Sequence, residues 1–126
     1  MKVTGTVFSG RGACSRAVRA GVYPESLLGF KPEFGSLNVV VDVGLVAEIE
    51  KRFTKYVVPY YGQGLWFWKG TIESDVMIPC AIMWPVPGAT KRQCIEETNV
   101  LEILAPIHLR TKLNLKDGSK IEFSLK

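Results

Sequence analysis

The chain has 126 residues, of which 47% are hydrophobic and 22% charged, and its formal net charge is +4. This length fits one domain, residues 1–126, whose folding buries about two-thirds of the unfolded surface, and the composition excludes a disordered or fibrous protein. No apolar run approaches the roughly 18 residues that a membrane-spanning helix needs, and the N-terminal stretch is too short and polar for a secretory signal. We therefore expect a soluble, cytoplasmic monomer that does not contact a membrane.

The cysteine spacing and the charge balance indicate which kinds of site and ligand to expect. Three cysteines without a Cys-x-x-Cys spacing predict neither a disulfide framework nor a zinc site, so reduced thiols are expected. The 16 Lys and Arg exceed the 12 Asp and Glu only modestly, which suits an anionic ligand such as a nucleotide. A nucleic-acid-binding protein usually carries a dominant basic stripe, so nucleic acid is not the expected partner.

The first half of the chain predicts short strands and one clear helix. The alternation of Val3–Phe8 predicts a strand that enters a glycine-rich turn. Pro24–Leu28 can form one helical turn with proline at its first position, and Leu37–Val43 is typical of a β-branched strand. Apolar residues at helical spacing over residues 45–53 predict an amphipathic helix.

The second half is predicted to be mostly β. Pro106 can open a helical turn that runs to Leu113, and Leu113–Lys116 with Lys120–Phe123 flank Asp117-Gly118, a strong signal for a two-residue hairpin. Six or seven short strands with little helix predict an all-β protein with minor α content, arranged as a small barrel. The other predicted strands are Val57–Tyr61, Leu65–Ile72, Val76–Trp84 and Val100–Leu104. Turns are expected at Gly62–Gly64 and Glu73–Asp75, and a loop at Pro85–Thr90.

A glycine-rich segment after the first strand is a candidate phosphate-binding loop. Glycines allow backbone N–H groups to approach phosphate oxygens closely, and Arg11 or Arg16 can add a charge-assisted contact. The alternative is a plain β-turn with arginines facing solvent. The segment is not a Walker A loop, because the Gly-Lys-Ser/Thr ending is absent. The candidate residues are Arg11, Gly12, Ala13, Cys14, Ser15 and Arg16.

Ser36 and Asn38 form a candidate magnesium site. Residues two apart in a strand point to the same side, so the Ser36 hydroxyl and the Asn38 amide oxygen are expected to converge. Magnesium bound to a nucleotide takes only one or two protein oxygens and fills its other positions with phosphate and water. The alternative is a turn-to-strand transition in which both side chains cap the backbone.

Glu102 interrupts an otherwise apolar strand. A carboxylate is costly to bury unpaired, so Glu102 should face an opening or a partner, and it could accept a hydrogen bond from a substrate hydroxyl. The alternative is an outward-facing residue on an edge strand. His108, the single histidine, has no Ser, Cys or Asp beside it and is expected to be a surface or loop residue rather than a catalytic one.

Aromatic residues cluster around the Trp66-Phe67-Trp68 run, near Tyr60 and Tyr61. Most such clusters belong to a core, and alternate residues of this strand must face opposite sides. One ring could still wall a pocket for a flat ligand.

Five segments of the chain, taken in order, form a pattern typical of one family. They are Gly5–Gly12, Leu28–Pro32, Gly35–Asn38, Leu101–Pro106 and Leu109–Gly118. Together they resemble the archaeal-type CTP-dependent riboflavin kinases, and the resemblance spans nearly the whole chain and is weakest from Val43 to Lys69. It implies a six-stranded Greek-key barrel of the cradle-loop type with one or two short helices, and Mg²⁺-assisted transfer of the γ-phosphate of CTP to the 5′-hydroxyl of riboflavin, giving FMN.

The resemblance also implies roles for the candidate residues. The loop from Arg11 to Arg16 would cover the CTP phosphates, and Ser36 and Asn38 would hold Mg²⁺. Glu102 would meet the ribityl end of the flavin as base or orienter, and Cys94 would lie near the phosphate of the flavin product. The residues implied to contact the cytidine, largely through backbone groups, are Ile107, His108, Leu109 and Arg110.

Three positions depart from the pattern of that family. Cys14 replaces the usual third glycine of the loop, and Ser36 replaces a threonine. Cys94 stands where a further threonine is expected, unless the loop is shifted so that Thr90 takes that place. Cys14 and Cys94 favour an alternative function, a catalytically weakened relative that binds a flavin or a nucleotide. A nucleic-acid-binding barrel is a third possibility, favoured only by the net charge.

Overall fold

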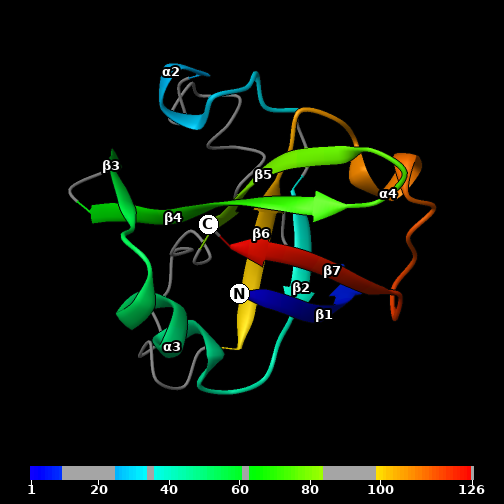
Figure 1. Cartoon of the computed structure of the whole chain (residues 1–126), viewed down its shortest axis with the longest axis horizontal. Coiled ribbons are helices and arrows are strands. Elements are labelled where there is room, and N and C mark those ends of the chain that lie inside the picture. Colours follow the sequence, from blue (N-terminus) through cyan, green and yellow to red (C-terminus); the bar gives the residue numbers. More distant parts are fainter. Residues whose placement is uncertain (10–24, 34–35, 61–62, 84–98, 126) are drawn as a thin grey trace.

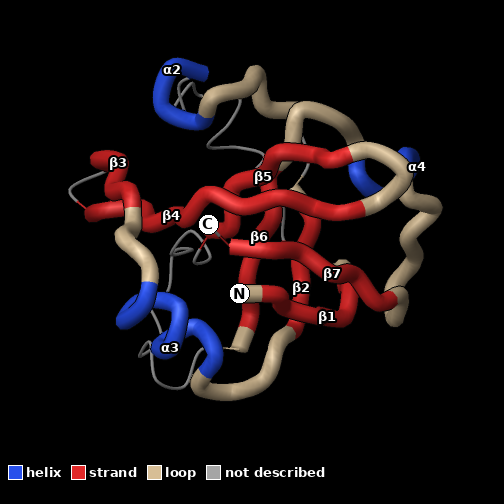
Figure 2. The backbone as a smooth tube through the Cα atoms, viewed as in Figure 1, coloured by secondary structure: helices blue, strands red, loops and turns tan. Residues whose placement is uncertain are grey.

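The computed structural model describes residues 1–9, 25–33, 36–60, 63–83 and 99–125 (Figures 1 and 2). Strands dominate these ranges, and the three helices lie at the periphery of the strands. The elements are β1 (Lys2–Phe8), α2 (Glu25–Leu28), β2 (Leu37–Val40), α3 (Leu45–Arg52), β3 (Tyr56–Tyr60), β4 (Gln63–Glu73), β5 (Met77–Met83), β6 (Val100–Leu104), α4 (Leu109–Lys112) and β7 (Lys120–Leu125).

Six antiparallel strands close into a barrel. The sheet runs in the order β3-β4-β5-β6-β2-β1-β7, and a further pairing of β4 with β7 joins its ends, leaving β3 as an extension beside β4. This confirms the predicted all-β class and the six-stranded barrel. None of the helices in the described ranges is long and apolar enough to cross a membrane.

The long strand β4 makes closure possible by changing partners along one edge. Its first part pairs with β3, and residues 70–72 pair with β7. Gly70 stands at the change, where a Cβ atom would lie 2.5 Å from Ile82 Cδ1 and 2.6 Å from the Ser124 carbonyl oxygen. Only glycine allows the two strands to approach so closely.

The barrel interior is an apolar core to which each strand gives alternate residues. From α3, Val46 and Ile49 add to it, which confirms the predicted amphipathic helix. Complete burial of one such side chain stabilises the fold by about 1.5–3 kcal/mol. The largest buried core residues include Trp68, Phe123, Leu37, Ile82, Leu101 and Ile103.

Strand β1 leads from the chain termini to the candidate site. Lys2 pairs with Ser124 and the Leu125 N–H donates to the Met1 carbonyl at 2.9 Å, so the two ends of the chain lie side by side. Phe8, at the far end of β1, pairs with Asn38 of β2. At about 3.3 Å per residue, the six steps from Lys2 to Phe8 span about 20 Å.

One predicted element is wrong. Leu113–Lys116 is not a strand, and Asp117-Gly118 does not close a hairpin with Lys120–Phe123. After α4, Asn114 adopts a left-handed conformation (φ 53°), and the Leu115 N–H donates to the Arg110 carbonyl at 2.9 Å. The backbone therefore does not have strand geometry at these residues. Gly118 has a φ of 94°, whereas Asp117 has no positive φ, so the turn lacks the two positive values of a type I′ hairpin.

The other element boundaries differ by a few residues. Strand β2 ends at Val40 rather than Val43, because the chain turns there towards Gly44 (φ 89°), which precedes α3. Gln63 and Gly64, expected in a turn, pair with β3 instead. The predicted loop Pro85–Thr90 lies outside the described residues.

Candidate active site

Ser36, Asn38 and Glu102 lie together on the outer face of the barrel. Asn38 of β2 is directly opposite Glu102 of β6, and the Ser36 hydroxyl donates to Glu102 Oε2 at 3.5 Å. The neighbours of these residues, Leu37 and Leu101, point into the core, so strand alternation directs the polar side chains outwards. Asn38, predicted as a metal ligand, and Glu102, predicted to accept a hydrogen bond from a substrate hydroxyl, thus form one cross-strand pair.

Glu102 is not the solvent-facing residue of an edge strand that one interpretation of the sequence expected. Strand β6 lies between β5 and β2, and Glu102 is only 6% exposed; Asn38 is 9% exposed. Desolvation of a carboxylate costs several kcal/mol, which makes such a residue unusual in an apolar strand without a chemical use.

The outer face places this pair in a longer row of side chains. Register pairs Phe8 with Asn38, Asn38 with Glu102, and Glu102 with Met83, which in turn is opposite Phe67. Phe67 and Met83 are fully buried, so one flank of Glu102 is apolar. The other flank is the end of β1, where the chain enters the glycine-rich segment.

Residues 107–110 are the segment that the resemblance predicts to contact the cytidine. Their side chains do not all point in the same direction. Leu109 is buried in the core and Ile107 is partly buried against it, so these two side chains are less available to a ligand than the backbone of the segment. His108 is exposed and shares a hydrogen bond of 2.8 Å with the Thr111 hydroxyl, in keeping with the surface role expected for it.

The Arg110 side chain turns back towards β1. Its Nη2 donates to the Phe8 carbonyl at 3.1 Å and to Asp117 Oδ1 at 2.8 Å. The same carboxylate accepts a bond from the Ser9 hydroxyl, at 2.8 Å to Oδ2 and 3.0 Å to Oδ1. Hydrogen bonds from Arg110 and then Ser9 lower the pKa of Asp117 below its usual value.

Sequence reasoning missed both Ser9 and Asp117 as members of this arrangement. Asp117 was predicted only as a turn residue, and its contact with Ser9 spans 108 positions. No local pattern reports such a contact, and the opposite charge of Arg110 was the single available signal.

The remaining predicted site residues lie outside the described ranges. These are Arg11, Gly12, Ala13, Cys14, Ser15 and Arg16 of the glycine-rich segment, and Cys94 of the predicted flavin site.

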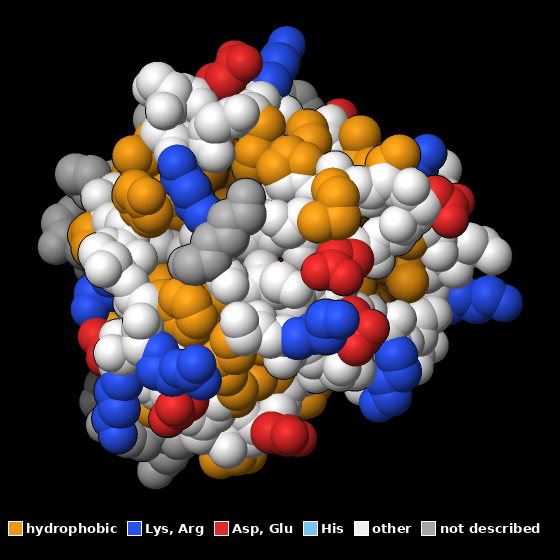
Figure 3. Space-filling model, in the orientation of Figure 1, with side chains coloured by type: hydrophobic (Ala, Val, Ile, Leu, Met, Phe, Trp, Pro, Cys, Tyr) orange, Lys and Arg blue, Asp and Glu red, His pale blue; other side chains and the backbone are white. Residues whose placement is uncertain are grey.

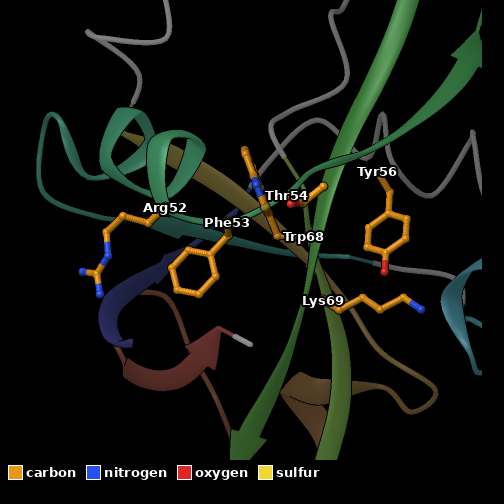
Figure 4. Close-up of a pocket in the computed structure, with 6 residues that line it drawn as sticks. All are labelled: Arg52, Phe53, Thr54, Tyr56, Trp68 and Lys69. Carbon is orange, nitrogen blue, oxygen red and sulfur yellow. The ribbon is translucent and has the colours of Figure 1, made fainter.

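A cavity of about 530 Å³ lies elsewhere, between the end of α3 and strand β4 (Figure 4). Among the described residues, its lining includes no predicted site residue and no carboxylate. Tyr56 in this lining stacks on Phe67 with ring centroids 5.1 Å apart. The described lining of this cavity thus lacks the carboxylate that the Ser36, Asn38 and Glu102 group contains. The cavity is lined by Arg52, Phe53, Thr54, Tyr56, Trp68 and Lys69.

Comparison with known proteins identifies the family of the chain. The profile of the CTP-dependent riboflavin kinase family, also described as a domain of unknown function (DUF120), matches residues 7–125. The chain belongs to this family. The match runs from the end of β1 through β7 and confirms the resemblance found in the sequence.

Archaeal relatives named riboflavin kinase are 30% identical to this chain over the aligned residues. The riboflavin kinase of Methanobrevibacter smithii is 30% identical over 128 residues, which cover 96% of this chain and 97% of that protein. That of Methanococcus aeolicus is 30% identical over 132 residues, with 98% of each chain covered. The Saccharolobus solfataricus riboflavin kinase is also 30% identical, across 96% of this chain and 71% of that longer protein.

Proposed function

We propose that this protein is a CTP-dependent riboflavin kinase, which transfers the γ-phosphate of CTP to the 5′-hydroxyl of riboflavin and forms FMN. The observation that carries the proposal is the buried Glu102 carboxylate, opposite Asn38 and 3.5 Å from the Ser36 hydroxyl, in a chain of this family. Family membership supports the kinase activity, and the buried polar group supports an active site at this place on the barrel.

Ser36 and Asn38 are the residues proposed to hold Mg²⁺. Their donor set fits this ion, since a hydroxyl and an amide oxygen on one face are hard ligands and leave the remaining positions to phosphate and water. When bound, the ion would neutralise charge on the transferred phosphoryl group.

Glu102 is proposed to accept a hydrogen bond from the riboflavin 5′-hydroxyl. This bond orients the attacking oxygen and gives its proton an acceptor, and a loose transition state requires little base strength from the carboxylate. The apolar flank formed by Met83 and Phe67 excludes water from one side of Glu102, which strengthens its electrostatic interactions.

CTP is proposed to lie between the glycine-rich segment, Arg11 to Arg16, and residues Ile107 to Arg110. Phe8 and Ser9, which lead into the first segment, are joined to the second through Arg110. Because Ile107 and Leu109 bury their side chains, recognition of the base by the backbone of this segment is consistent with the packing. Cys94 is proposed to lie near the flavin phosphate.

One incubation tests the proposal against its rivals. The purified protein is mixed with riboflavin, Mg²⁺, and either CTP or ATP, and FMN is measured by chromatography. We expect FMN from CTP. Binding of flavin or nucleotide without any FMN would favour the catalytically weakened relative that Cys14 and Cys94 suggest.

A nucleic-acid partner remains disfavoured. Among the described residues on the face seen in Figure 3, Lys and Arg side chains are interspersed with Asp and Glu and form no basic stripe. A monomer in the cytoplasm is still our expectation, and size-exclusion chromatography with light scattering tests the first part of it.

A further inference from the structure

Asp117 lies at a junction of three chain segments. Its carboxylate accepts hydrogen bonds from the Ser9 hydroxyl, at 2.8 and 3.0 Å, and from Arg110 Nη2 at 2.8 Å. The same Nη2 donates to the Phe8 carbonyl at 3.1 Å. Ser9 is the residue directly before the glycine-rich segment, and Arg110 ends the proposed cytidine segment. One carboxylate therefore joins the end of the 107–110 segment to the residue that leads into the glycine-rich segment.

The backbone fixes Asp117 independently of these side-chain contacts. The Gly118 N–H donates to the Val7 carbonyl and the Val7 N–H to the Ser119 carbonyl, both at 2.8 Å. Within the turn, the Ser119 N–H donates to the Lys116 carbonyl at 3.0 Å, and Gly118 supplies the positive φ of 94°. Asp117 is thus held against β1, two residues before Ser9, by bonds that a change of its side chain leaves in place.

The solvent exposure of these side chains favours a role in positioning over a role in stability. The Asp117 side chain is 60% exposed and that of Arg110 is 32% exposed. Ion pairs so open to solvent add little to the free energy of unfolding. They can still restrict where the Arg110 guanidinium and the Ser9 hydroxyl lie, and phosphate transfer is sensitive to displacements of about 1 Å.

We propose that Asp117 is a positioning residue for the nucleotide. Its carboxylate holds the Arg110 guanidinium and the Ser9 hydroxyl in fixed positions beside the 107–110 segment, which is proposed to bind CTP. This inference rests on the proposed kinase function and extends it to a residue that does not itself touch the substrate. An asparagine at this place keeps the shape but loses the charge that attracts the guanidinium.

The test compares Asp117→Asn and Ser9→Ala, singly and together, with the wild type and an Asp42→Asn control. Asp42 is exposed and lies two residues after the end of β2, whereas Asn38 is near the start of that strand. We expect Asp117→Asn to raise the KM for CTP about tenfold, the effect of one weakened charge-assisted contact, and to leave the KM for riboflavin within about twofold. Calorimetric titration should show the same loss for CDP.

The double variant tests whether the two side chains act as one unit. If Ser9 acts through Asp117, Ser9→Ala should add less than about twofold to the effect of Asp117→Asn. If the effects of the two single substitutions on the KM for CTP multiply in the double variant, the two side chains do not act through one network. Equal increases in both KM values would also overturn the inference, because they would show that the effect is not confined to the binding of CTP. A general loss of folded protein would instead lower the apparent kcat and leave both KM values unchanged.

The outcomes also separate this inference from the function that it assumes. A wild type that makes FMN from CTP, together with an Asp117→Asn variant whose KM for CTP is unchanged, removes the inference and leaves the kinase. A wild type that neither makes FMN nor binds CTP removes the proposed function, and the inference with it.

Discussion

Replacement of Glu102 by glutamine should move activity and stability in opposite directions. The substitution keeps the size and one acceptor oxygen of a side chain that is 6% exposed and 3.5 Å from the Ser36 hydroxyl. It removes the charge proposed to orient and accept the riboflavin hydroxyl. Positioned acid–base groups contribute about 10²–10⁴-fold, and because a loose transition state needs little base strength we expect the lower end, a loss of about 10²-fold in kcat/KM for riboflavin.

The stability of the same variant follows from the desolvation of the carboxylate. Removal of a buried charge is often neutral or stabilising, so the melting temperature should stay the same or rise by a few degrees, about 3–6 °C for each 1 kcal/mol in a domain of this size. A loss of 10²-fold in rate corresponds to about 2.7 kcal/mol in the barrier. The two effects are therefore separable in one set of measurements.

The assay is steady-state FMN formation at saturating CTP, with thermal denaturation of the same preparations. Glu122→Gln is the matched control, because Glu122 is an exposed glutamate of β7. An unchanged rate and KM in Glu102→Gln would refute the catalytic assignment. A large fall in melting temperature would show instead that the charge serves the fold.

Three further predictions follow from other parts of the structure. Asn38→Ala should reduce turnover by about 10²-fold or more at fixed Mg²⁺, with circular dichroism unchanged; wild-type rates across a Mg²⁺ titration would contradict the metal assignment. Gly70→Ala should destabilise the protein by about 1–3 kcal/mol, because its Cβ would lie 2.5 Å from Ile82 Cδ1 and 2.6 Å from the Ser124 carbonyl oxygen; urea denaturation measures this, and an unchanged midpoint would disprove the close approach. The pKa of Asp117 is lowered by hydrogen bonds from Arg110 and Ser9, so its small stabilising effect is fully present above the unfolded pKa of about 3.9 and is lost as the pH falls through the lower folded value. The melting temperatures of wild type and Asp117→Asn should accordingly converge in acid, and a difference that grows as the pH falls would contradict the sign.

Most of the strands could be predicted because each carries its signal locally. The alternation of β1 and the apolar run of β6 predicted their positions, and the helical spacing of Val46 and Ile49 with their neighbours predicted α3. The false hairpin arose because Asp117-Gly118 specifies a turn and not its partner strand. The residues before the turn are diverted at Asn114, and the turn binds β1 instead.

The candidate site was predicted as separate parts and not as an arrangement. Strand alternation could place Ser36 and Asn38 on one side, but the pairing of Asn38 with Glu102 depends on the register of β2 with β6, which spans more than sixty residues. The direction of the Arg110 side chain was also beyond local reasoning, since its partners Phe8 and Asp117 follow no common period.

The position of the termini has a practical consequence for engineering. Met1 and Leu125 lie at the end of β1 that is about 20 Å from Phe8 and the groups around it. An affinity tag, a fluorescent fusion or an appended domain at either end would therefore extend from the end of the barrel that is far from the proposed reaction centre. The same adjacency means that a short peptide could link the two ends and let the chain be reopened at a surface turn such as Ser74–Val76.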